Sequence, residues 1–243
     1  MQLETIGTGP RVVLVHGSVV GPATWDSVRP LADRYTLVVV ARPGFGEGDP
    51  IERVDFERDA RLVGELLEPG DHLVGHSYGG VVSLLAAAGR DDLRSLTVVE
   101  PPAFGLAPGA PGLAAVKEQY ARGPETEPRE HLARFLELVG SAIRLPDELP
   151  PQLERGARLL QVERGPWEAE IPLEELARKP YPKLVVSGGH SAMFDAVVDV
   201  LVERLGAEHA ILPGAGHSAQ RAPGFNERLG DFLDRAELDV APY

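Results

Sequence analysis

The sequence contains no cysteine among its 243 residues. Without thiols the chain can form neither a disulfide bond nor a thiolate metal site, and it cannot use a cysteine nucleophile. A reducing cytosol permits such a composition, so we expect a cytoplasmic protein. Histidine and acidic residues also lack the spacing of a metal site, and we expect neither a metal nor another cofactor.

Long apolar runs and positive charge are scarce as well. No stretch approaches the roughly 18 apolar residues of a membrane span, and residues 1–5 lack the features of a signal peptide. The 24 lysines and arginines are outnumbered by 37 acidic residues, which gives a net charge of −13. An acidic chain without a basic stripe repels nucleic acid. We therefore expect neither a membrane nor a nucleic acid as a partner.

Short apolar runs alternate with helical patterns along most of the chain. The runs lie at 11–15, 35–40, 72–74, 95–99, 183–187 and 208–212. The helical patterns lie at 25–34, 56–67, 81–88, 196–205 and 225–233. This alternation predicts an α/β fold with a doubly wound, mostly parallel sheet, in which ligands bind at the carboxyl ends of the strands.

Residues 103–179 interrupt this alternation. They contain no strand-like run, begin with a stretch rich in proline and glycine, and show helical patterns around 113–120, 129–143, 153–160 and 173–177. A helical insertion between two strands of one sheet should lie over the edge of that sheet. We therefore predict an α/β core formed by residues 1–102 and 180–243, with residues 103–179 as a helical cap.

The most informative motif lies at residues 75–79, which read Gly-His-Ser-Tyr-Gly. This Gly-x-Ser-x-Gly pattern stands between an apolar run and a helical one. A strand that turns sharply into a helix through such a sequence holds its serine on a strained elbow, and the small residues keep the backbones from colliding. Ser77 is therefore the candidate nucleophile, and it needs a general base and a third group that orients the base.

His217 is the preferred base among seven histidines. It follows the last predicted strand across a glycine-bearing loop, so it can reach over the elbow, and the chain order becomes serine, acid, histidine. His190 also follows a strand and is the rival base. We expect His16 to shape its loop and His76 to pack under the turn. The histidines at positions 72, 131 and 209 are expected to be structural or solvated.

Two carboxylates compete for the role of the acid. Asp195 is the first one after the strand at 183–187, but it lies at the entrance to a helix, where stabilisation of the helix N-terminus explains it well. Glu100 stands directly at the end of the strand at 95–99, before two prolines. A charge at the end of a buried strand is costly without a partner, and a histidinium is such a partner. We therefore prefer Glu100.

An oxyanion hole requires two backbone N–H groups directed at the developing negative charge. Tyr78 follows the nucleophile at a helix N-terminus and is expected to supply one of them. The loop that begins His16-Gly17 should supply the other, from Ser18 or alternatively from Val19. Val19 and Trp167 are further candidates for lining the substrate pocket, although Trp167 fits a core position equally well.

These pieces together resemble the α/β-hydrolase superfamily. The resemblance rests on His16-Gly17 with Trp25 downstream, on Arg-Pro-Gly-Phe-Gly at 42–46, on the elbow, and on Gly-Ala-Gly-His at 214–217. In most members the acid follows the strand that corresponds to 183–187, whereas here Ser191 stands about where that aspartate would be. Some members carry the acid one strand earlier, which matches Glu100. This form is similar to bacterial esterases and lactonases, including zearalenone-lactonase-like enzymes.

The sequence thus predicts a serine hydrolase of the carboxylesterase or lactonase type. It would cleave a small, mostly apolar ester, lactone or thioester through an acyl-enzyme on Ser77, without a cofactor. Two alternatives stay open. The same fold also hosts lyases and acyltransferases, and a ligand-binding receptor could retain an inert triad.

Overall fold

The computed structural model describes residues 1–238. Its centre is a seven-stranded sheet with the strand order β1-β3-β2-β4-β5-β6-β7, in which β1 runs antiparallel to β3 and all other neighbours are parallel. The strands are β1 (Gln2–Ile6), β2 (Arg11–Val15), β3 (Thr36–Ala41), β4 (His72–His76), β5 (Ser95–Val99), β6 (Lys183–Ser187) and β7 (Glu208–Ile211).

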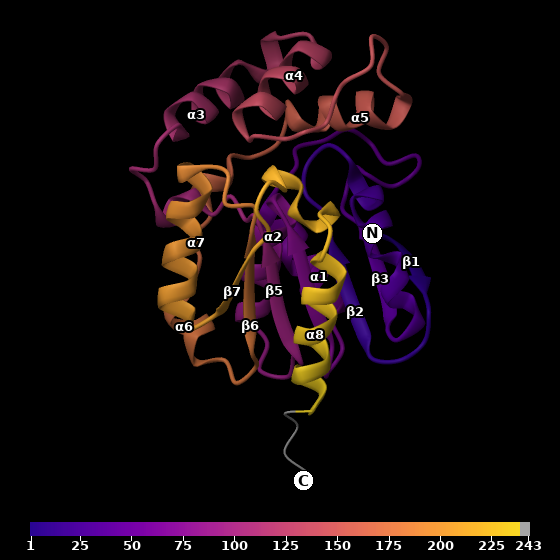
Figure 1. Cartoon of the computed structure of the whole chain (residues 1–243). Helices are drawn as coiled ribbons and strands as arrows, with labels where there is room; N and C mark the ends of the chain where they lie inside the picture. The colour runs from indigo at the N-terminus through magenta and orange to yellow at the C-terminus, as the bar shows by residue number, and fades with distance from the viewer. Residues whose placement is uncertain (239–243) are drawn as a thin grey trace.

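Helices cover both faces of this sheet (Figure 1). Side chains alternate between the faces, so Val13 and Val15 pack into one hydrophobic cluster while Val12 and Leu14 pack into the other. The first face carries α1 (Phe56–Leu66), α2 (Tyr78–Ala88), α6 (Leu173–Arg178) and α7 (Ala192–Leu205). The second face carries the 3₁₀ segment η1 (Gly21–Asp33) and α8 (Phe225–Leu238). This is the predicted doubly wound α/β architecture.

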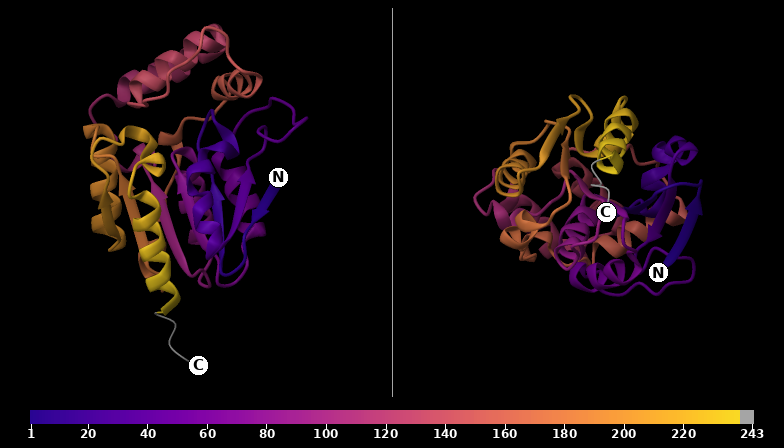
Figure 2. Two further views of the ribbon diagram at one scale, coloured as in Figure 1. Left: turned by 45° about the vertical axis from the view of Figure 1, so that its right-hand side comes forward. Right: turned by 90° about the horizontal axis from the view of Figure 1, so that it is seen from below.

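Three further helices lie across the carboxyl end of the sheet: α3 (Leu113–Arg122), α4 (Pro128–Leu138) and α5 (Pro151–Leu160). Figures 1 and 2 show them as a separate layer above the strands. The segment 103–179 adds no strand to the sheet, and its last helix, α6, packs against α7 and α2 rather than over the sheet end. The layer over the carboxyl end is therefore shorter than the predicted insertion.

Several predicted elements differ in detail from the structure. Strand β1 was not predicted; it is an exposed antiparallel edge strand whose pattern lacks a buried face. The predicted helix at 25–34 is a 3₁₀ segment that begins at Gly21 and contains Pro30, which lacks the N–H that a regular helix requires. Helix α7 begins at Ala192, four residues before the predicted start at 196, and α4 ends at Leu138 rather than at 143.

The sheet order also fixes where a ligand can bind. The chain passes from β2 to β3 on one side and then to β4 on the other side of β2. The carboxyl ends of β2 and β4 therefore flank the point where the direction of winding reverses, which is where open α/β sheets bind their ligands. Gly17 follows β2 and Ser77 follows β4 at this point.

Candidate active site

Ser77 occupies the tight turn between β4 and α2. Its backbone has φ +53° and ψ −127°, a strained conformation for a residue other than glycine. A Cβ atom on Gly75 would lie 2.4 Å from the carbonyl oxygen of Gly79, and one on Gly79 would lie 2.3 Å from that of Val15. Only glycine fits at both positions, so the two glycines allow the turn to close and hold Ser77 at the carboxyl end of the sheet.

A line of hydrogen bonds joins the three residues that the sequence analysis proposed as nucleophile, base and acid. The Ser77 Oγ lies 2.9 Å from His217 Nε2, and His217 Nδ1 lies 3.4 Å from Glu100 Oε2. Glu100 follows β5 with φ +50°, which is again strained. Its other oxygen, Oε1, accepts a hydrogen bond from the N–H of Gly188 at 2.6 Å. An alcohol, an imidazole and a carboxylate from three distant stretches of chain therefore meet at one edge of the sheet.

Burial controls the ionisation of this line. It lowers the pKa of His217 to about 3, and nearby His190 adds to the effect, so the imidazole is neutral and free to accept a proton at pH 7. Burial also raises the pKa of the Glu100 carboxyl to about 7, against the opposing effects of the Gly188 N–H and His190. Near neutral pH a fraction of Glu100 is ionised and can stabilise an imidazolium.

The rival residues occupy other places. Asp195 lies in the first turn of α7, and within residues 1–238 the carboxylate that hydrogen-bonds His217 belongs to Glu100 instead. His190 Nε2 lies 3.1 Å from the carbonyl oxygen of Val139, while its Nδ1 lies 3.7 Å from Glu100 Oε1. His190 is therefore placed behind the acid rather than beside Ser77.

Two further histidines shape the backbone around the site. His76 Nε2 lies 2.9 Å from the carbonyl oxygen of His217 and so holds the loop that carries the candidate base. His16 is fully buried; its Nδ1 lies 2.7 Å from the carbonyl oxygen of Gly17, and its Nε2 lies 3.1 Å from the backbone nitrogen of Arg42. Both lie where the sequence expected them.

Two backbone N–H groups near Ser77 have no hydrogen-bond acceptor among residues 1–238. Tyr78 is the first residue of α2, and within the described chain neither its N–H nor that of Ser18 donates a hydrogen bond. The loop of Ser18 approaches the nucleophile closely, since a Cβ atom on Gly17 would lie 2.7 Å from the Ser77 Cβ. Val19, the alternative donor, has φ +74° and lines the cavity beside Ser77.

Two small cavities meet at Ser77 and His217. The inner cavity has a volume of about 10 Å³. Mainly apolar side chains enclose it, including Pro102, Phe104, Val116, Tyr120, Phe135 and Phe194. The outer cavity, of about 30 Å³, has a more polar lining, formed by Val19, Thr24, Phe135, Ser218, Gln220 and Arg221 among others. Side chains of the helical layer, Phe135 among them, line both cavities.

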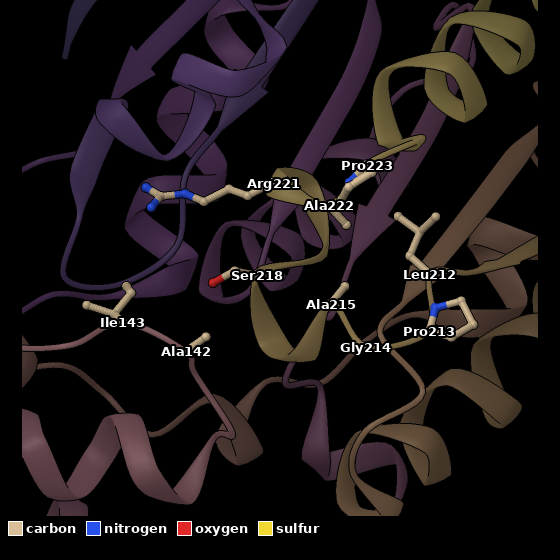
Figure 3. A pocket seen from close by; sticks show the side chains of 10 residues that line it. All are labelled: Ala142, Ile143, Leu212, Pro213, Gly214, Ala215, Ser218, Arg221, Ala222 and Pro223. Carbon is tan, nitrogen blue, oxygen red and sulfur yellow. The ribbon is translucent and has the colours of Figure 1, made fainter.

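The outer cavity continues into a surface groove of about 520 Å³, with which it shares Ile143, Ser218 and Arg221. Figure 3 shows this groove between the Ala142–Ile143 segment on one side and Leu212 and Pro213 on the other. Of its ten lining residues only Arg221 carries a charge. The site thus opens to the surface on the side of the loop that carries His217.

Trp167 does not line either cavity at Ser77. Its indole instead packs edge-on against Tyr120, with ring centroids 5.1 Å apart, while the neighbouring Pro166 lines the inner cavity. Of the two pocket candidates from the sequence, the structure therefore brings only Val19 to the site.

Sequence reasoning missed a buried polar cluster next to the site. Glu163 is bonded to the hydroxyl groups of Ser18 and Tyr120, and Arg42 is bonded to Asp59 at 2.8 Å with both side chains fully buried. The sequence around Glu163 contains no recognisable motif. Its contact with Ser18 is therefore evident only in the folded structure. The hydrogen bond from the Gly188 N–H to Glu100 was also not predicted, because no local motif indicates it.

Among residues 1–238, no cluster of three or more histidine and acidic side chains is arranged to hold a metal ion. In that part of the chain no helix has both the length and the apolar character needed to cross a membrane.

Comparisons with known proteins place the chain in a family. A family model described as the alpha/beta hydrolase family matches residues 12–226. A pimeloyl-[acyl-carrier protein] methyl ester esterase from Aeromonas salmonicida is 32% identical over 242 residues, which cover 90% of this chain and 92% of that protein. An esterase of the same description from Methylococcus capsulatus is 34% identical over 170 residues, 68% of this chain and 65% of its own length.

A solved structure agrees with these matches. The crystal structure of an alpha/beta hydrolase fold protein from Burkholderia ambifaria superposes with a TM-score of 0.74 at 25% sequence identity, covering 94% of this chain and 93% of that one. The chain belongs to the alpha/beta hydrolase family.

Proposed function

We propose that this alpha/beta hydrolase family member is a serine esterase that works through an acyl-enzyme on Ser77. The observation that carries the proposal is the hydrogen-bonded line from Ser77 through His217 to Glu100, with distances of 2.9 and 3.4 Å. Beside it lie two backbone N–H groups that have no acceptor in the described part of the chain. The two esterase relatives support ester hydrolysis, because their described activity is the cleavage of a methyl ester.

In the proposed reaction, Ser77 Oγ attacks the ester carbonyl carbon while His217 Nε2 accepts the hydroxyl proton. Glu100 orients the imidazole and stabilises the imidazolium that forms. The N–H groups of Tyr78 and Ser18 bind the oxyanion, an interaction typically worth a factor of about 10²–10³ in rate for each donor. His217 then donates the proton to the leaving alcohol, and it activates a water molecule that releases the acid from Ser77.

The two cavities suggest how an ester would lie in the site. The loop of His217, which would protonate the leaving oxygen, also lines the outer cavity through Ser218, Gln220 and Arg221. The leaving group is therefore assigned to the outer cavity and its groove, and the acyl group to the inner cavity. Because about 10 Å³ holds roughly one water molecule, the inner cavity favours short apolar acyl groups. Small lactones and thioesters present the same carbonyl carbon and are further candidate substrates.

Hydrolysis of p-nitrophenyl acetate tests this proposal. Wild-type protein should release p-nitrophenol with multiple turnovers and incorporate ¹⁸O from labelled water into the acetate. Ser77→Ala should lose at least about 10³-fold in rate, as expected when the nucleophile of a triad is removed, while its unfolding midpoint stays close to that of the wild type. Activity retained in Ser77→Ala would remove Ser77 from the mechanism and overturn the proposed function.

A further inference from the structure

A second buried group of polar side chains joins the helical layer to the loop after β2. Its centre is Glu163, whose side chain is 1% exposed. The Ser18 Oγ lies 2.7 Å from both carboxylate oxygens of Glu163, and the Tyr120 hydroxyl donates to one of them at 2.8 Å. Arg42, itself fully buried, lies 3.9 Å from the same carboxylate. Burying this carboxylate is costly, so stability alone explains its presence poorly.

The loop that Glu163 holds is strained. Val19 has φ +74°, a conformation that is a genuine outlier for a β-branched residue, so its surroundings must maintain it. From the sheet side, the Arg42 guanidinium donates to the carbonyl oxygens of His16 and Gly17 at 3.0 and 2.9 Å. From the other side, α5 lies so close that a Cβ atom on Gly156 would be 2.0 Å from the Val19 carbonyl oxygen.

Glu163 holds this loop through a side chain of the loop and not through its backbone. It binds the hydroxyl group of Ser18, while the backbone N–H of Ser18 has no acceptor within residues 1–238. The loop is thereby fixed, but the N–H that would bind the oxyanion is not consumed. The segment that carries Glu163 is attached independently of its carboxylate, because Val54 N donates to the Val162 carbonyl at 3.1 Å and Arg164 N donates to the Val54 carbonyl at 2.9 Å.

We propose that Glu163 is a positioning residue for the oxyanion hole: through the Ser18 hydroxyl it holds the Ser18 N–H in the direction of the reacting carbonyl. This inference rests on the proposed esterase function. Without Glu163 the loop can relax from the strained conformation at Val19, and the Ser18 N–H turns away from the oxyanion. An oxyanion-hole donor displaced by about 1 Å can cost up to about 100-fold in rate.

The Ser18→Ala and Glu163→Leu variants test this role, because leucine cannot accept the hydrogen bond from the Ser18 hydroxyl. Glu170→Leu is the matched control, since Glu170 is an exposed acid on the same segment. Both test variants should lower kcat for p-nitrophenyl acetate by about 10- to 100-fold, with KM changed less than about twofold, since the interaction acts in the transition state. Their affinity for a trifluoromethyl ketone, which forms an oxyanion on the serine, should fall by a similar factor. The control should match the wild type.

A double-variant cycle separates positioning from a merely structural role. If Glu163 acts through the Ser18 hydroxyl, the Ser18→Ala/Glu163→Leu protein should be no slower than the slower single variant. Additive losses, or wild-type kcat and inhibitor affinity in both single variants, would overturn the inference. So would lower unfolding midpoints with unchanged inhibitor affinity. These outcomes leave the esterase proposal intact if Ser77→Ala is inactive, so the two failures are distinguishable.

Discussion

Replacement of Glu163 by glutamine should change how the stability of the protein depends on pH. Burial raises the pKa of Glu163 from 4.5 to about 7, although Arg42 and the hydroxyl groups of Ser18 and Tyr120 oppose the effect. Asp59, which lies on the far side of Arg42, adds to the increase. A carboxyl group with a higher pKa in the folded than in the unfolded protein binds its proton more tightly when folded. Its contribution to stability is therefore complete below about pH 4.5 and is lost as the pH rises through about 7.

The size of this effect follows from the two pKa values. A tenfold difference in proton affinity corresponds to about 1.4 kcal/mol, so the difference between 4.5 and about 7 corresponds to about 3 kcal/mol. No discount for solvent screening applies, because the side chain is 1% exposed. Glutamine has nearly the same shape and does not titrate. Relative to the wild type, Glu163→Gln should therefore gain about 3 kcal/mol in unfolding free energy between pH 4.5 and pH 8.

Urea unfolding followed by circular dichroism between pH 4.5 and pH 8 measures this difference. Glu100, whose pKa burial also raises, titrates in both proteins and cancels from the comparison. Glu170→Gln provides the control for loss of one negative charge and should follow the wild type at each pH. Wild-type and Glu163→Gln curves that stay parallel across this range would show instead that Glu163 ionises in the folded protein as it does in the unfolded chain.

Three further predictions concern catalysis. Glu100→Gln should lower kcat in an ester assay at least about 100-fold, because it removes the charge that stabilises the His217 imidazolium. Asp195→Asn should change kcat less than twofold. The reverse ranking of the two variants would assign the role of the acid to Asp195. Because burial raises the pKa of Glu100 to about 7, kcat/KM should fall as the pH drops below about 7, and a profile flat to pH 5 would contradict this. Phe104→Ala should shift the preference of kcat/KM from p-nitrophenyl acetate toward the hexanoate, since Phe104 lines the inner cavity and not the outer one; an unchanged chain-length ranking would place the acyl group elsewhere.

Strands β2 to β6 could be predicted from the sequence because they are short, mostly apolar runs that the fold buries on both faces. Strand β7 was predicted as well, although only Ala210 of its residues is buried. The elbow could also be predicted, since the sequence places glycine at 75 and 79, where the backbones approach too closely for a Cβ atom. Strand β1 could not, because its side chains are mostly exposed and its sequence therefore lacks the apolar run by which the other strands are recognised. The 3₁₀ segment at Gly21–Asp33 escaped prediction because its apolar pattern resembles that of a regular helix while Pro30 interrupts the hydrogen bonding.

The candidate site likewise contains residues that the sequence predicts and residues that it does not. Ser77, Glu100 and His217 each follow a recognisable strand, and parallel strands bring their carboxyl ends to one edge, so their meeting could be expected from chain order alone. Glu163 follows no strand of the sheet, and its bond to Ser18 spans 145 residues. No local pattern encodes such a contact. The position of Trp167 beside Tyr120 rather than beside Ser77 likewise depends on how the helical layer packs.

The proposed function depends on Ser77 being a nucleophile that His217 activates. Fluorophosphonate labelling followed by peptide mass mapping measures this activation. We expect one adduct, on the peptide that contains Ser77, formed at least about 100-fold more slowly in His217→Ala, because a serine hydroxyl without its base is a poor nucleophile. An adduct on a different residue, or labelling of Ser77 at the same rate without the imidazole, would show that His217 does not activate Ser77.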